Sequence, residues 1–357
     1  MDLHVRGVVL PDDEERDLWI SGGVLTAEPA PRAETVASRG WIVPGLVDCH
    51  CHIGLGPHGA GLTDPEDVRA QAYTDRDAGA LLVRDAGVPV DNTWLDGDPA
   101  APRIVHAGQH LARYKRYMPG LGIDVEPDGL VEAVAEQAKR GGGWVKLVGD
   151  WIDRSVGDLA PLWPAAALSA AVARAHELGA RVAVHTFGEE ALPDLIAAGV
   201  DSIEHGTGLT ADLLDEVARR GIAVVPTLLN LENFPGIADG AGRYPVYAAR
   251  MRRLYGSARD RLRAAFEAGV PMYCGTDAGS MVRHGMVTEE IRAMQALGLP
   301  AADALAAGSW AARDWLGLPG LVPGAPADLV VYDADPRADL RILDAPARIV
   351  LRGTVVK

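Results

Sequence analysis

The sequence predicts a (β/α)8 TIM barrel with a small β-sandwich formed from both chain termini, and three observations support this. From about Trp41 to Asp277, short apolar runs alternate with longer stretches rich in Ala, Leu, Arg and Glu, as in repeated βα units. There are eight apolar runs, the number of parallel strands in such a barrel. Both ends of the chain instead alternate apolar and polar residues with a period of two, which is typical of β-strands.

The barrel elements can be assigned in chain order. The runs that we interpret as its strands are WIVPGLVDCHCHI, ALLVRDAGV, RIVHAG, WVKLV, RVAVH, VDSIEH, IAVVPT and VPMYCGTD. The segment PDGLVEAVAEQAKRG begins with Pro and acidic residues and ends in Gly, which are the usual start and stop signals of an α-helix. The segments AALSAAVARAHELG and ADLLDEVARRG are interpreted as helices in the same way.

The two ends predict a second domain. LHVRGVVL and LWISGGVLTA near the start, and ADLVVYDAD and ARIVLRGTVVK near the end, read as strands. Neither end is long enough to build its own core, so we expect them to pair with each other. Residues 1–43 and 320–357 should therefore form a composite β-sandwich, while residues 44–319, close to the roughly 250 residues typical of a barrel, form the barrel domain.

Composition excludes several classes of protein. With 357 residues, 48% of them hydrophobic and 23% charged, the chain is globular and not disordered. Its formal net charge of -15 is opposite to that of a nucleic-acid-binding protein. Three cysteines are too few for a disulfide framework, and we see neither a signal peptide nor a membrane span. We expect a cytoplasmic protein without a nucleic-acid or membrane partner, with a homo-oligomer left open.

Two histidines in the first strand, His50 and His52, form a chelating pair. They are two residues apart, so both imidazoles project from one face of the strand while Cys49 and Cys51 point the other way. A single histidine would be read as a hydrogen-bonded structural residue. Paired at the carboxyl end of a barrel strand, the two favour a metal site, and ligation by the cysteines is the weaker alternative.

Three other strands end in potential metal ligands. His185 ends RVAVH, His205 ends DSIEH and Asp277 ends YCGTD. The carboxyl ends of barrel strands share one mouth, where catalytic residues lie. Core packing does not explain so many polar side chains in one place, because buried polar groups without partners are costly. Imidazole and carboxylate together suit zinc or a similar divalent ion.

Lys146 lies midway along the apolar strand WVKLV. A buried ammonium needs a partner, and one interpretation is a salt bridge to an acid such as Asp150 or Glu204. The other is that the amine loses its proton and reacts with carbon dioxide, giving a carbamate that bridges two metal ions. Burial beside cations lowers the pKa of a lysine and favours that reaction. The residues alone leave both interpretations open.

Motifs along nearly the whole chain resemble the metal-dependent amidohydrolase superfamily, in the branch of imidazolonepropionase-like proteins and Xaa-Pro or Xaa-Arg dipeptidases. They are PGLVDCHCH, AGALLVRDAG, WVKLV, AVHTFG, DSIEHG, GTDAG and the final PGAPADLVVYDADP and IVLRGTVV. The resemblance implies two divalent metal ions, with zinc as our expectation, and N6-carboxylation of Lys146. It assigns ligands to the more buried ion and then to the second ion as follows: His50, His52 and Asp277, then His185 and His205, with Lys146 bridging both.

The same resemblance implies the reaction. A hydroxide bridging the two ions attacks the carbon of an amide, and Asp277 acts first as base and then as acid. His110, in AGQHLARY, is a second catalytic candidate that could polarise the substrate carbonyl. The residues that we expect to contact substrate are Arg113, Arg116, Asn230 and His284, and Glu204 could orient a metal ligand.

The loops carry no motif that identifies the substrate. We favour amide hydrolysis of a small, carboxylate-bearing molecule. The alternatives are a lactonase, a mononuclear deaminase-type enzyme on the same barrel, or a non-catalytic scaffold of the same fold. A scaffold predicts lost ligands, whereas all six positions are present. A deaminase predicts one metal ion and an unmodified lysine.

Overall fold

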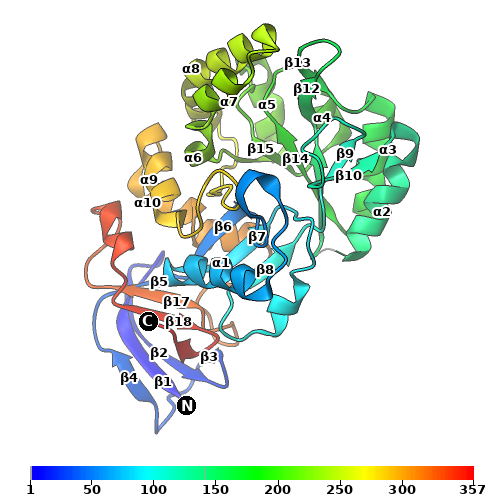
Figure 1. The fold of residues 1–357 in the computed structure, drawn as a ribbon. Coiled ribbons are helices and arrows are strands. Elements are labelled where there is room, and N and C mark those ends of the chain that lie inside the picture. Colours follow the sequence, from blue (N-terminus) through cyan, green and yellow to red (C-terminus); the bar gives the residue numbers. More distant parts are fainter. Residues whose placement is uncertain (1, 141) are drawn as a thin grey trace.

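Strands from both ends of the chain share one eight-stranded sheet in the computed structural model, which describes residues 2–140 and 142–357. β5 (Trp41–Pro44) lies between β1 (Leu3–Val9) and β17 (Leu329–Tyr332), so the C-terminal strands extend the N-terminal ones. Figure 1 shows both termini at this end of the molecule. The other strands of the sheet are β2 (Glu14–Ser21), β3 (Val24–Thr26), β4 (Glu34–Ala37), β18 (Arg348–Leu351) and β19 (Thr354–Val355).

This arrangement differs from the predicted β-sandwich, because the strands are hydrogen-bonded into one sheet and not into two stacked sheets. Alternation along the strands explains the difference. Val5, Ile42 and Val331 face a small core of their own, while Val43 and Val330, their neighbours in sequence, belong to the main core of the protein. The parallel strands and helices thus cover one face of the sheet, while the other face lines the small core that the terminal strands form themselves.

The middle of the chain forms parallel sheets. One has the order β6-β7-β8 and the other β10-β9-β11-β14-β15-β16, and every pairing in both is parallel. Their strands are β6 (Leu46–Cys51), β7 (Ala80–Asp85), β8 (Arg103–His106), β9 (Leu111–Arg113), β10 (Ile123–Val125), β11 (Trp144–Val148), β14 (Arg181–Thr186), β15 (Ser202–His205) and β16 (Ala223–Val225). In these sheets seven of the eight predicted runs contain strands, as the βα alternation indicates.

The eighth run, residues 270–277, is not a regular strand, so that part of the prediction was wrong. Pro271 has no N–H to donate, and Gly275 passes so close to β6 that a Cβ there would lie 2.7 Å from the Cβ of His50. The run is nevertheless held by backbone hydrogen bonds from Cys49 to Cys274 and from Asp277 to His50, both 2.7 Å long. A parallel bridge from Val224 to Met272 links its other side to β16. The sheets therefore do not form one continuous closed ladder.

Helices surround the parallel strands (Figure 1). The three helices predicted from their start and stop signals are α2 (Leu130–Arg140), α3 (Ala165–Glu177) and α5 (Ala211–Arg220). The others are α1 (Pro65–Asp77), α4 (Leu192–Ala198), α6 (Leu228–Leu231), α7 (Phe234–Gly240), α8 (Pro245–Glu267), α9 (Val287–Leu297), α10 (Ala301–Ala307) and α11 (Trp310–Trp315). A hairpin of β12 (Asp150–Asp153) and β13 (Asp158–Pro161) was not predicted. In the described part of the chain, none of the helices combines the length and apolar character needed to cross a bilayer.

Candidate metal centre

Six potential metal ligands line one pocket at the carboxyl ends of the parallel strands. The space between its atoms, open mouth included, is about 620 Å³. β6 supplies the first histidine and the residue just after β6 the second, while β11, β14, β15 and the loop after residue 276 supply the others. The six residues are His50, His52, Lys146, His185, His205 and Asp277. Sequence positions more than two hundred residues apart thus meet at one site.

His50 and His52 both point a ring nitrogen at Asp277. Their Nε2 atoms lie 3.3 and 3.0 Å from Oδ1 of Asp277. The other ring nitrogens are engaged: Nδ1 of His50 is 2.6 Å from Glu204 Oε2, and Nδ1 of His52 is 2.8 Å from the carbonyl oxygen of Gly87. Such partners fix the ring orientation and leave Nε2 for a metal ion, as is usual for ligating histidines. These three side chains can hold one ion.

His185 and His205 form a second group of donors. Nδ1 of His185 lies 2.9 Å from Nε2 of His205, while Nδ1 of His205 faces Thr227 Oγ1 at 2.7 Å. Burial lowers the pKa of His205 to about 3 and holds that of His185 well below its usual range. Both imidazoles are therefore neutral at physiological pH, the form that binds metal.

Lys146 is buried beside these histidines, with 1% of its surface exposed, and its Nζ has no hydrogen-bond partner among the described residues. The salt bridges considered from the sequence are not made. Asp150 instead accepts the backbone N–H groups of Phe187 and Gly188, and Glu204 is bonded elsewhere. Burial lowers the pKa of Lys146 to about 8. A buried amine without a partner is costly, which favours a chemical role.

Glu204 contacts both a candidate metal ligand, His50, and a buried arginine, Arg84. It accepts two hydrogen bonds from Arg84 Nη2, at 2.7 and 2.8 Å, as well as facing His50. Burial would raise the pKa of Glu204, but Arg84, Lys146 and His50 hold it well below its usual range. Arg84 in turn lies over the rings of Trp144 and Trp315, 4.5 and 5.0 Å from their centroids. An ionised Glu204 therefore fixes the ring of His50.

Two of the six donors have strained backbones. His205 and Asp277 have φ angles of 68° and 60°, and Thr227, the partner of His205, has 47°. Residues other than glycine rarely adopt positive φ, and where they do the strain is often associated with function. The fold thus places these side chains at the strand ends at a cost in backbone energy.

The structure places the remaining predicted residues differently from one another. His110 lines the pocket, 1% exposed, with its ring 5.3 Å from that of His52, and Asn230 lines it too. Burial, followed by the charge of His52, holds the pKa of His110 well below its usual range, so this imidazole is neutral.

Arg113, Arg116 and His284 are not among the described residues that line the pocket, and their role as substrate contacts stays a prediction. Arg116 is bound to Asp153 and to two carbonyls of the β12–β13 hairpin, and Arg113 faces Glu126 Oε2 at 3.4 Å. His284 faces Asp75 in α1, with 2.8 Å between Nδ1 and Oδ2. In each case another part of the chain supplies a partner for the side chain.

Sequence reasoning missed other residues of the site. Arg84 lies within the predicted apolar strand ALLVRDAGV, and a charged residue there is the same signal that singles out Lys146. Tyr117, Trp151 and Phe187 line the pocket from loops or from the unpredicted hairpin. No pattern of spacing marks such loop residues in a single sequence.

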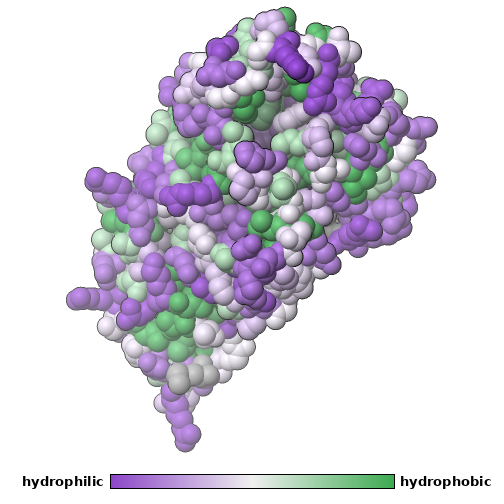
Figure 2. Space-filling model, in the orientation of Figure 1, coloured by the Kyte–Doolittle hydropathy of each residue, from purple (hydrophilic) through white to green (hydrophobic). Residues whose placement is uncertain are grey.

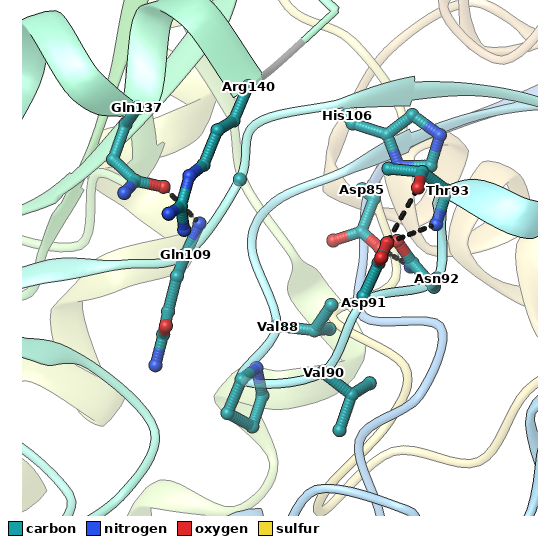
Figure 3. Close-up of a pocket in the computed structure, with 12 residues that line it drawn as sticks. Asp85, Val88, Val90, Asp91, Asn92, Thr93, His106, Gln109, Gln137 and Arg140 are labelled. Atoms are coloured by element: carbon teal, nitrogen blue, oxygen red, sulfur yellow. Dashed lines mark hydrogen bonds between the residues drawn. The ribbon is translucent and has the colours of Figure 1, made fainter.

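A larger hollow lies elsewhere, beside the loops that follow β7 and β8 (Figure 3). Its polar groups largely bond to one another: Asn92 donates to Asp85, and Gln137 accepts the backbone N–H of Gln109. None of the six donors lines it among the described residues. The chemistry is therefore concentrated in the smaller pocket.

Comparison with known proteins identifies the family. The model of the amidohydrolase family matches residues 126–356. The chain belongs to that family. It is 56% identical over 352 residues to an uncharacterized protein of Mycobacterium tuberculosis, covering 98% of this chain and 95% of the relative. It is also 25% identical over 355 residues to ochratoxinase of Aspergillus niger, covering 86% and 73%.

Solved structures agree with this assignment. A crystal structure of a Xaa-Pro dipeptidase with bound methionine superposes with a TM-score of 0.83 at 23% identity, over 100% of this chain and 99% of the other. The resemblance predicted from the motifs is confirmed, and this amidohydrolase is an enzyme with the mixed α/β fold of its relatives.

Proposed function

We propose that this amidohydrolase is a binuclear metal-dependent hydrolase that cleaves an amide bond of a small molecule, at the mouth of a (β/α)8 barrel. The observation that carries the proposal is the unpartnered Nζ of Lys146 among neutral histidines and an ionised aspartate. A protein-only site would be expected to give the amine a partner. A carbamate on this nitrogen, bound to cations, would supply one.

The donor set fits two zinc-like ions. His50, His52 and Asp277 would hold one, with ligand atoms within 4.8 Å of one another, and His185 and His205 would hold the other. Lys146, once carboxylated, would offer an oxygen to each. When bound, such ions acidify a water molecule and polarise a carbonyl.

Asp277 is the proton carrier in this proposal. Burial would raise its pKa, but His50, His52 and His205 hold it well below the usual range, so it is a carboxylate ready to accept a proton. It would take a proton from the attacking water and deliver it to the departing nitrogen, as a general base and then a general acid. The neutral ring of His110, with Nδ1 unpartnered among the described residues, would donate a hydrogen bond to the substrate oxygen.

A closed barrel is part of the proposal. Backbone contacts of residues 271–278 with both β16 and β6, and of Gly142 with His106, support joining the two parallel sheets into one wall. The hydrolase domain would then span 44–319, and residues 1–43 and 320–357 would form the domain of terminal strands. Ochratoxinase, a prolidase complexed with N-methylphosphonate-L-proline and molinate hydrolase share the fold, which supports cleavage of an amide or a related bond.

The proposal is tested by activity and metal content together. Zinc-supplemented enzyme should hydrolyse simple N-acyl amides faster than matched lactones, and Lys146→Ala should lose about 1,000-fold or more in kcat/KM while remaining folded by circular dichroism. Lys139→Ala, at an exposed site, is the matched control. Unchanged amide turnover in Lys146→Ala would refute the bridging role. Faster cleavage of lactones would favour the lactonase alternative, and a single bound ion a deaminase-type centre.

A further inference from the structure

Beyond the reacting groups, the wall of the pocket is aromatic and aliphatic. Tyr117 and Trp151 meet edge to face, with ring centroids 4.7 Å apart, and Trp151 lies 5.3 Å from His185. Phe187 continues this wall, 4.9 Å from His205. Aromatic side chains in this arrangement favour a planar or apolar group packed against them. On the face shown in Figure 2, hydrophobic surface is interspersed with hydrophilic surface in the half of the molecule that holds the parallel strands.

The lining also includes aliphatic side chains. Leu55 and Leu121 are almost fully buried, and Met281 is 58% exposed at the mouth. Asn230 is one of the few neutral polar side chains here, and its Oδ1 accepts a hydrogen bond from Asn233. The aromatic and aliphatic parts of the lining therefore offer dispersion contacts and little electrostatic attraction for a charged group.

The two arginines predicted to contact a substrate carboxylate already bind carboxylates of this chain. Arg116, the best candidate for a substrate carboxylate, donates to Asp153 Oδ2 at 2.9 Å and to the carbonyls of Trp151 and Ala160. Among the described lining residues, Lys146 is the one lysine or arginine, and it belongs to the candidate metal centre. A substrate carboxylate would enter without the two-pronged partner that arginine supplies, and would lose hydration without replacement.

A substrate ammonium group would also lack a free partner among the described lining residues. Among the described residues that line the pocket, Asp277 carries the acidic group, and it is committed to His50 and His52. Neither terminal charge of a dipeptide thus has a partner on the pocket wall. This lining does not favour the carboxylate-bearing substrate expected from the sequence, for which Arg113 and Arg116 were the predicted contacts.

We infer that the substrate is an uncharged amide that carries an aromatic or branched apolar group, and not a dipeptide with charged ends. The inference rests on the proposed function of the same site. The apolar group would pack against Tyr117, Trp151 and Phe187, on the side of His185 and His205. The scissile carbonyl would then lie over the metal centre, with Asp277 on its far side.

A pair of compounds that differ by one carboxylate tests this. N-phenylacetylpyrrolidine and N-phenylacetyl-L-proline present the same acyl group and the same amide. We expect kcat/KM to be at least about 10-fold higher for the pyrrolidine compound. Equal or higher kcat/KM for the proline compound would overturn the inference while leaving amide hydrolysis intact.

A charge placed at the mouth sharpens the test. Met281→Arg should raise kcat/KM for the proline compound, relative to the pyrrolidine compound, by about 10-fold, because it supplies the missing partner. Val246→Arg is the matched control, since Val246 is also 58% exposed but is not a lining residue. The control should leave the ratio unchanged, and an equal shift in both variants would contradict the inference.

Binding separates failure of the inference from failure of the proposed function. Calorimetry of the two compounds with zinc-supplemented Asp277→Asn enzyme, in which turnover should be about 1,000-fold slower, compares their binding to the metal-loaded pocket. Tighter binding of the neutral compound with no cleavage by the zinc-supplemented enzyme would overturn amide hydrolysis and keep the inference. Tighter binding of the proline compound would overturn the inference whatever the activity.

Discussion

Lys146 and Arg313 are both buried cations, but they differ in whether the described residues supply hydrogen-bond partners. Arg313, 2% exposed, faces Asp328 at 3.5 Å and the carbonyl of Gly45 at 3.3 Å. Asp328 also accepts from Arg103 at 2.5 Å, so the junction of the terminal sheet and the parallel strands is a network complete within the chain. Lys146, 1% exposed, has no such partner among the described residues.

The difference shows that the pocket, unlike the network around Arg313, leaves buried polar groups without partners among the described residues. Buried polar groups that only hold a fold together are normally satisfied by the chain itself. At the junction the side chains of Arg103, Arg313 and Asp328 are satisfied by the chain, whereas in the pocket the amine of Lys146 and one ring nitrogen each of His110 and His185 are not. Positive φ angles at His205 and Asp277 add strain at the same end. The pocket is therefore built for bound partners and the junction for stability.

Removing the proton carrier should have the largest effect on activity. Asp277→Asn keeps an oxygen for a metal ion but cannot accept a proton, so kcat should fall by about 1,000-fold, within the range for general acid–base catalysis. Kinetics with a metal assay on the same sample checks this. Asp303→Asn, exposed on α10, is the control. Near-native turnover in Asp277→Asn would defeat the assignment.

Breaking the junction should instead cost stability. Asp328→Asn would leave Arg103 and Arg313 without their carboxylate and should lower the free energy of unfolding by about 3 kcal/mol, as for other buried ion pairs that lose one partner. Urea unfolding measures the loss, with the exposed Asp260→Asn as control. Metal content per folded molecule should stay at the wild-type value. A loss of metal with unchanged stability would reverse the roles given to the two regions.

Substitution of Glu204, which contacts the ring of His50, should have a smaller effect, on metal affinity. Glu204→Gln removes the charge that orients His50 and should weaken metal binding by about 10- to 100-fold, as is typical of changes behind a ligand. Competition with a chromophoric chelator measures the affinity. Glu136→Gln, exposed on α2, should match the wild type. Unchanged affinity in Glu204→Gln would show that the ring of His50 is held by other contacts.

The pair of His284 and Asp75 should give the smallest effect, on the pH dependence of stability. Burial alone would lower the pKa of His284, but Asp75 raises it above the usual value. A raised folded-state pKa adds stability that is complete below the unfolded-state pKa, about 6.5, and is lost as pH rises through the folded-state pKa.

The stability gap between wild type and His284→Asn should therefore be wider at pH 5.5 than at pH 9. Urea unfolding at the two pH values checks this, with His176→Asn as a partly exposed control. A gap that is constant or widens with pH would contradict the charged pairing.

The site was more predictable than its walls. His50, His52 and Lys146 could be found because a polar residue in an apolar strand conflicts with burial, and because strand periodicity fixes the face of each side chain. Arg84, a charged residue in an apolar strand, carries the same signal. The engagement of Arg116 depends on Asp153 in a hairpin that no turn motif announced, and that of His284 on Asp75, 209 residues away.

The fold was predictable for a related reason. Alternating βα segments indicate parallel strands wherever hydrophobic runs and helix signals recur, and the terminal strands paired as the short ends required. Pro271 and Gly275 carried the information that the eighth run is irregular, yet the approach of Gly275 to His50 is a long-range contact that periodicity does not encode. One sheet instead of two arose likewise from packing between distant segments.

The central claim is that Lys146 is carboxylated and shared by two ions, and the most direct measurement is the ¹³C spectrum of the enzyme equilibrated with zinc and ¹³C-bicarbonate, with zinc counted on the same sample. We expect one carbamate resonance and two zinc ions per chain, with the resonance absent from Lys146→Ala. A spectrum without that resonance, in protein that still holds two zinc ions, would contradict the claim.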